Sequence, residues 1–128
     1  MLGHGGHAAA DFAVSMLPKM IADRLTNSSR STDDISRVLS ESIRALDKEI
    51  EDGVTGLFAN DVDALARLPQ GAIDDTVRRN HEKILLGMTG TTALVALIDE
   101  KTENLWIANL GDCQAGMCLI GYMFASML

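Results

Sequence analysis

The character of the sequence changes once, close to Gly87, and this change limits the chain to folds that combine helices with a strand hairpin. Before it, apolar residues recur every three or four positions, which lines up one face of a helix. After it, the segment TTALVALID (91–99) is β-branched and apolar without that spacing, as in a buried strand. A second such segment, LWIANLGD (105–112), follows the connection EKTEN, so an antiparallel hairpin is expected. Helices followed by a hairpin indicate the α+β class.

Two long helices are expected in the first half of the chain. The first covers residues 7 to about 25, although Pro18 should kink it or restart it, because proline lacks the donor that a helix interior needs. The second begins after a capping side chain, Ser31 or Thr32, and runs to about residue 51. The two apolar stripes consist of Ala9, Phe12, Ala13, Met16, Leu17, Met20, Ile21 and Leu25, and of Ile35, Val38, Leu39, Ile43, Leu46 and Ile50.

The stretch between the second helix and Gly87 is less regular. It predicts a short helix near residues 62–68 and a weak helical pattern over 73–85. A third strand is expected after Gln114, because a sheet of only two strands is marginally stable. The chain therefore looks like part of something larger.

Composition narrows the classes of function. The chain has 128 residues, 47% of them apolar, which suits one domain with a core. Its net charge of −7 argues against a nucleic-acid or anionic-membrane partner, since those surfaces need a basic patch.

The apolar run MCLIGYMFASML has 12 residues, short of the ~20 that span a bilayer. No signal peptide is recognisable, and Cys113 and Cys118 do not resemble a disulfide framework, which favours a reducing compartment.

The N-terminal stretch GHGGH contains two histidines, His4 and His7, and leaves two interpretations open. Both side chains could face one metal ion, because positions three apart are neighbours on a helix. However, the glycines disfavour a helix, and no third ligand lies near in the sequence. Alternatively, the stretch is a glycine-rich loop that leads into a helix N-terminus and lets the backbone approach an anion closely.

Three motifs in order resemble the protein phosphatase 2C family, the PPM-type metal-dependent serine/threonine protein phosphatases. GHGGHAAADF (3–12) is similar to the family's Asp-Gly-His-Gly-Gly entry into a helix, TGTTA (89–93) to its Ser/Thr-Gly-Ser/Thr-Thr-Ala strand, and ANLGDC (108–113) to its Ala-Asn-x-Gly-Asp-Ser/Cys strand end. The resemblance covers roughly residues 3–116. It implies a partial α-β-β-α four-layer sandwich, with two long helices and a hairpin, in a partial domain over 1–116 that is followed by a divergent apolar tail, 117–128.

The resemblance also implies a chemistry. Two Mg²⁺ or Mn²⁺ ions activate a water molecule, which attacks the phosphorus of a phosphoserine or phosphothreonine in a phosphoprotein substrate. The roles of the family's residues can be transferred to the matching positions of this sequence. The resemblance then implies that the carbonyl of Gly3 is a metal ligand and that His4 is the catalytic acid that protonates the leaving alcohol. Asp112 becomes a ligand of an additional, weaker metal ion. No phosphate-binding residue is carried over.

The sequence departs from the family pattern at the metal ligands. Leu2 stands where the family has its bridging aspartate, and Asp112 is the last acidic residue, so the later metal aspartates have no counterpart. We therefore expect an incomplete, inactive fragment of a phosphatase, truncated at both ends. The alternative is a non-catalytic, phosphatase-like binding module. Open sheet edges would favour self-association, and the expected compartment is the cytoplasm or the mitochondrion, with no targeting segment in this chain.

Overall fold

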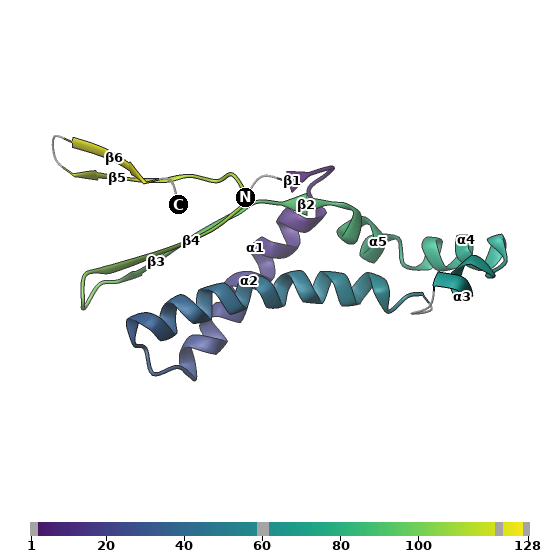
Figure 1. Ribbon diagram of the computed structural model, residues 1–128, viewed down its shortest axis with the longest axis horizontal. Coiled ribbons are helices and arrows are strands. Elements are labelled where there is room, and N and C mark those ends of the chain that lie inside the picture. The colour runs from purple at the N-terminus through teal and green to yellow at the C-terminus, as the bar shows by residue number, and fades with distance from the viewer. Residues whose placement is uncertain (1–2, 59–61, 120–121, 127–128) are drawn as a thin grey trace.

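The structure is a computed structural model and describes residues 3–58, 62–119 and 122–126 (Figure 1). Its helices are α1 (Ala8–Thr26), α2 (Thr32–Thr55), α3 (Val62–Ala66), α4 (Gln70–Arg79) and α5 (His81–Met88). Its strands pair in antiparallel twos: β1 (Gly3–His4) with β2 (Gly90–Thr91), β3 (Ala93–Asp99) with β4 (Asn104–Leu110), and β5 (Ala115–Leu119) with β6 (Tyr122–Ser126). This mixture of helices and small sheets agrees with the expected α+β class, whereas the four-layer sandwich stays a prediction.

Helix α2 follows from its local sequence. Ser31 has the extended backbone of an N-cap residue, and its hydroxyl accepts the backbone N–H of Asp34 at 3.2 Å. Asp33 and Asp34 place carboxylates in the first turn, where they suit the positive end of the helix dipole. The predicted start is confirmed, and the helix continues past its predicted end to Thr55.

Helix α1 continues through Pro18, so the predicted restart is wrong. Pro18 lies on the exposed side of the helix, and so does Val14, whose carbonyl would otherwise accept the bond that proline cannot donate. Water can reach that carbonyl, so the missing bond leaves no buried group without a partner. Leu17 and Ile21 are buried on the opposite side and hold the helix against the core across the interruption.

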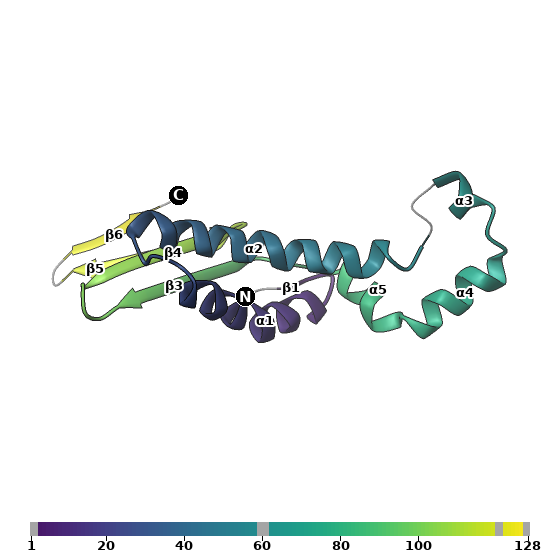
Figure 2. The same cartoon turned by 90° about the horizontal axis from the view of Figure 1, so that it is seen from below.

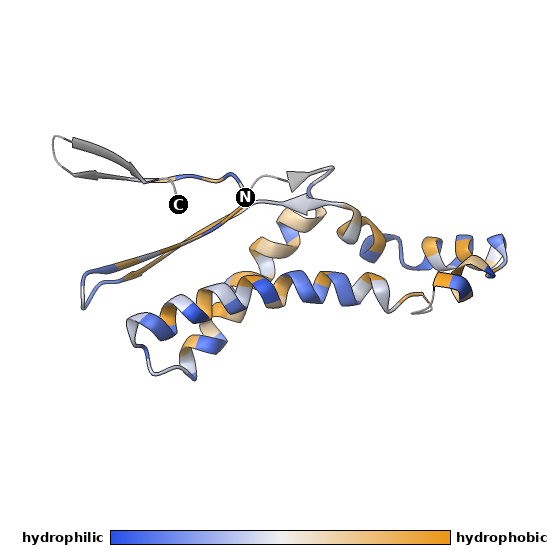
Figure 3. Cartoon of the chain, viewed as in Figure 1, coloured by the Kyte–Doolittle hydropathy of each residue, from blue (hydrophilic) through white to orange (hydrophobic). Residues whose placement is uncertain are grey.

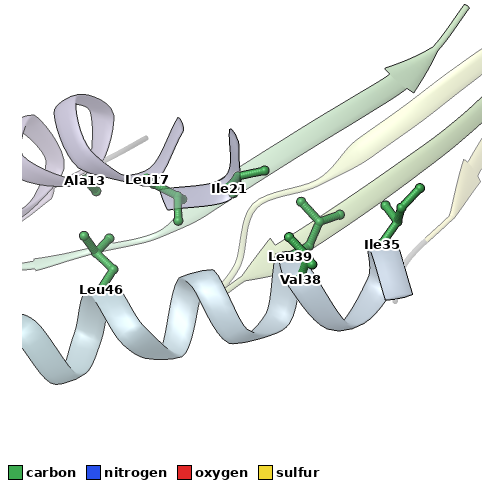
Figure 4. Close-up of a cluster of buried hydrophobic side chains, with 7 residues drawn as sticks. All are labelled: Ala13, Leu17, Ile21, Ile35, Val38, Leu39 and Leu46. Carbon is green, nitrogen blue, oxygen red and sulfur yellow. The ribbon is translucent and has the colours of Figure 1, made fainter. Parts of the chain in front are cut away.

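The core lies between α1, α2 and one face of the β3–β4 hairpin. Figure 4 shows side chains of α1 pointing toward those of α2 across the gap between the helices. The buried cluster consists of Ala13, Leu17, Ile21, Ile35, Val38, Leu39 and Leu46. The hydropathy colouring of Figure 3 shows apolar residues along the middle of the hairpin and polar residues at its tip.

The β3–β4 hairpin confirms the strand prediction, with continuous pairing from Ala93 opposite Leu110 to Asp99 opposite Asn104. Its inner face packs against the core through Val95, Leu97, Trp106 and Ala108. Its outer face exposes large apolar side chains, namely Ile98, Leu105 and Ile107. Both faces of this small sheet are therefore apolar.

Strand β5 is the strand that was expected after Gln114, but it pairs with β6 and not with β4. Figure 1 shows the β5–β6 hairpin diverging from β3–β4. Within the described strands, both outer edges of the β3–β4 hairpin are consequently unpaired.

Helices α3 and α4 project from the rest of the molecule, whereas α5 packs against α1 and α2. In Figures 1 and 2, α3 and α4 lie beyond the C-terminal end of α2, and neither helix buries a residue. The weak helical pattern over 73–85 is divided between α4 and α5, because the backbone of Asn80 leaves the helical conformation (φ −119°, ψ 27°). Among the described residues, no helix is both long and apolar enough to cross a membrane.

Candidate functional site

Strand pairing brings the first two motifs together, although most of the chain separates them in sequence. In the β1–β2 pair, Gly3 lies opposite Thr91 and His4 opposite Gly90. The pair lies at the N-terminal end of α1 (Figure 1). The first motif is therefore attached to the second by backbone pairing and leads directly into a helix.

The turn between β1 and α1 requires glycine at two successive positions. Gly5 has φ +75° and Gly6 has φ +148°, conformations that residues with a Cβ rarely adopt. A Cβ on Gly6 would also lie 3.1 Å from the methyl group of Thr89. Since His4 lies in a strand and His7 at the N-cap of α1, the two histidines do not share a helical face. The loop interpretation of GHGGH is the one that the structure supports.

Thr89 of the second motif caps the helix that the first motif opens. The backbone N–H of Ala9 donates to the hydroxyl oxygen of Thr89 at 3.1 Å, and that hydroxyl donates to the carbonyl of Leu86 at 3.2 Å. The N-cap residue itself, His7, makes no side-chain capping bond. Sequence reasoning missed this role of Thr89, because a capping residue is ordinarily sought just before the helix and not 80 positions later.

The second and third motifs meet at Thr92, which is buried at the base of the hairpin. The thiol of Cys113 donates to the hydroxyl of Thr92 at 3.2 Å. Gly111 has φ +84°, and a Cβ there would lie only 2.6 Å from the methyl group of Thr92. The side chain of Asn109 donates to the carbonyl of Gly111 at 3.3 Å and holds the end of β4 in place. All three motifs thus form one connected unit.

The described residues do not fit a two-metal centre. No group of three or more His, Cys, Asp or Glu side chains in the described part of the chain is arranged to hold a metal ion. Asp112 is exposed, and Gly3 and His4 are placed by the backbone pairing of β1. Leu2, where the bridging aspartate was expected, and the side chain of His4 lie outside the described residues. A binuclear site needs several carboxylate oxygens to offset its charge, and Asp112 belongs to no such group among the described residues.

Two described side chains have clearly shifted pKa values, and both lie on the surface away from the three motifs. A hydrogen bond to Asp52 raises the pKa of Lys48 on α2. A hydrogen bond from Thr102, with a second from the backbone N–H of Lys101, lowers the pKa of Asp99 at the tip of the hairpin. These shifts reflect local surface hydrogen bonds and do not indicate an acid–base site.

Comparison of the whole sequence with known proteins supports the assignment that the motifs suggest. The family model described as Protein phosphatase 2C matches residues 1–124. No curated protein and no solved structure was found to match the chain. The family match spans almost all of the 128 residues and contains all three motifs, so the chain belongs to the protein phosphatase 2C family.

Proposed function

We propose that this chain carries the scaffold of a PPM-type protein phosphatase and is catalytically inactive on its own. Family membership supports a protein phosphatase ancestry, phosphoprotein substrates and a general dependence on Mg²⁺ or Mn²⁺. The inactivity rests on the donor set: Asp112 has no partner carboxylates for a metal among the described residues, and Leu2 replaces the bridging aspartate. Without those oxygens, two divalent cations side by side would repel each other uncompensated.

The roles of individual residues belong to this proposal. By the resemblance of the motifs, we propose that Gly3 and Asp112 correspond to positions that bind metal in active family members, and that His4 corresponds to the catalytic acid. In this chain we regard them as inherited positions and not as a working site. The division into a phosphatase-like domain, 1–116, and an apolar tail, 117–128, is proposed on the same grounds.

Hydrolysis of p-nitrophenyl phosphate by the purified chain tests the proposal. We expect no turnover above the protein-free rate with Mg²⁺ or Mn²⁺, in a sample whose circular dichroism shows the helices of α1 and α2. The matched control is the His4→Ala variant, which should give the same background. Mn²⁺-dependent turnover that is lost on chelation and reduced in His4→Ala would overturn the proposal.

As an alternative, we propose a non-catalytic, phosphatase-like binding module. The three motifs are tied together by contacts of the chain itself, the Ala9–Thr89 and Thr92–Cys113 hydrogen bonds, which supports a role as a scaffold. The unpaired edges of the β3–β4 hairpin offer backbone groups to another strand, so we also propose that the chain self-associates through them.

The free thiol of Cys113 suits a reducing compartment, for which we propose the cytoplasm or the mitochondrion.

A further inference from the structure

A groove of about 420 Å³ runs between α2 and the unpaired edge of β4. We call it the α2–β4 groove. Its helix side consists of residues of α2 from Ser36 to Arg44, and its strand side of residues 106–110 of β4. Because β4 pairs only with β3 among the described strands, the backbone groups on its outer edge have no partner strand there, and residues of the same strand line the groove.

The helix side of the groove has a regular pattern. Ser36, Ser40 and Arg44 are spaced by four residues, so they follow one another along a single face of α2. From Ser36 to Arg44 the helix rises about 12 Å. From Trp106 to Leu110 the strand extends about 13 Å. The row of polar side chains and the free strand edge therefore have the same length, which is that of a five-residue extended segment.

The groove has an apolar floor and a cation at one end. Leu39 is 2% exposed and, with the half-buried Ile43, forms the floor. Helix α2 runs alongside β4 in the same direction, since Ile35 near its start lines one cavity with Trp106, and Leu46 further on lines another with Leu110. Arg44 therefore lies toward the Leu110 end of the groove.

Arg44 differs from the other basic residues along this part of α2. Arg37 is paired with Asp34 and Glu41, and Lys48 with Glu51 and Asp52. Arg44 has no ion pair with any residue that the structure describes, although the chain carries a net charge of −7. An unpaired guanidinium beside a free strand edge is complementary to an extended segment that carries an anionic side chain.

We propose that the α2–β4 groove binds an extended peptide segment of another protein, about five residues long, with an anionic side chain at one end. The segment adds to β4 as an antiparallel strand, the geometry that β3 already uses on the other edge. Its small apolar side chains lie on Leu39 and Ile43, and its phosphate or carboxylate, near its N-terminal end, lies against Arg44. This deepens the binding-module alternative and does not depend on catalysis.

The chain contains its own reporter for this binding. Trp106 is the only tryptophan and lines the groove, so its fluorescence should change when a strand covers it. The probes are three blocked heptapeptides of alternating valine and threonine with an N-terminal Gly-X pair, in which X is phosphoserine, aspartate or serine. Comparing their affinities distinguishes a phosphate from a carboxylate, and both of these anionic groups from a neutral hydroxyl. A fourth peptide carries phosphoserine at the C-terminal end and tests the strand direction.

Two charge-neutralising variants of α2 provide the matched comparison. Arg44→Gln removes the cation of the groove, and Arg37→Gln removes an exposed cation of the same helix that does not line it. We expect saturable changes in Trp106 emission, tightest for the phosphoserine peptide and weaker for serine. Arg44→Gln should weaken binding of the phosphoserine peptide by about tenfold, the worth of one charge-assisted hydrogen bond. Arg37→Gln should leave it within about twofold, because surface charges screened by salt act weakly over distance.

Three results would overturn the proposal. The first is an unchanged Trp106 emission with every peptide. The second is equal affinity for the phosphoserine, aspartate and serine peptides. The third is equal weakening by Arg44→Gln and Arg37→Gln in variants whose thermal unfolding matches the parent chain. Tighter binding of the reversed peptide would contradict the antiparallel direction. None of these results depends on phosphatase activity, so they are distinguishable from failure of the proposed function.

Discussion

Thr92 and Gly111 share one small space where the second motif meets the third. The threonine methyl group fills the volume that any larger residue at 111 would need, and its hydroxyl accepts the bond from Cys113. Thr89 acts in the same way on the first motif, by capping α1 through Ala9. Thr89, Thr92 and Gly111 thus hold the motifs together, which explains two threonines of TGTTA without reference to catalysis.

The Gly111→Ala variant should lower the free energy of unfolding by about 2 kcal/mol or more. The new methyl group faces a positive φ and sits too close to the Thr92 side chain, so strain and overpacking add. Urea unfolding followed by circular dichroism measures the change. Gly71→Ala is the control, because nothing lies within 4 Å of a Cβ there, and inside α4 it should stabilise by about 0.5–1 kcal/mol. Equal effects of the two variants would contradict this account.

The Thr89→Val variant keeps the shape of the side chain and removes the hydroxyl. We expect a loss of about 1 kcal/mol in the free energy of unfolding, because the N–H of Ala9 loses its capping acceptor. The comparison is Thr26→Val, whose hydroxyl bonds to the carbonyl of Ala22 on the exposed end of α1. That variant should change stability by less than about 0.5 kcal/mol. If chemical unfolding gave both variants the same midpoint, the cap would have no energetic role.

Single elements differ in how far their local sequence determines them. Helix α2 was predictable because its cap, its first-turn carboxylates and its apolar stripe all agree. The continuity of α1 through Pro18 was not, because packing of residues such as Leu17 decides it. The short strands β1 and β2 left no local pattern at all, since two residues are too few for one. In the candidate site, the three motifs could be identified from the sequence. The contacts between them could not, because those contacts depend on packing between distant parts of the chain.

The turn of the β3–β4 hairpin should respond to pH. The pKa of Asp99 is lowered mainly by the hydrogen bond from Thr102, so the folded turn favours the carboxylate form. The ionised Asp99 side chain therefore stabilises the folded turn. This stabilisation is fully present above about 3.9, the pKa of an aspartate in an unfolded chain, and is lost as the pH falls through the lower pKa of Asp99 in the folded chain. Amide hydrogen exchange across the hairpin should therefore speed up below about pH 4 relative to the helices.

The Asp99→Asn variant is the control for this pH response. It lacks the titrating carboxylate, so the exchange rates of its hairpin should keep the same ratio to those of α2 over the acid range. A parent chain whose hairpin-to-helix ratio is also constant with pH would show that Asp99 does not stabilise the turn.

On the scale of the whole molecule, apolar surface is distributed unevenly. The helices cover one face of the β3–β4 hairpin, and the outer face presents Ile98, of which 67% is exposed, together with Leu105 and Ile107. Two edges and one face of the hairpin are thus open in the described part of the chain. Such surfaces promote association, which natural proteins suppress with charged residues on edge strands.

Self-association should therefore depend on the β3 edge. Light scattering coupled to size-exclusion chromatography should show an apparent mass that rises with protein concentration. Ala96→Lys places a charge in the middle of β3 and should reduce that rise. Ala66→Lys makes the same change on the exposed helix α3 and should have no effect. A parent chain that stays monomeric at all concentrations would exclude self-association.

The hydrogen bond from Ala9 to Thr89 also has a consequence for the order of events during synthesis. It joins residues 80 positions apart, whereas α1 and α2 are consecutive helices that pack on each other. Contacts of long sequence separation form late, because the intervening loop must close first. At a synthesis rate of about 5–20 residues per second, Thr89 is added to the chain roughly 4–16 s after Ala9, the residue that it caps. We therefore expect the helical pair to form ahead of the motif assembly, which is completed only after Thr89 has been made.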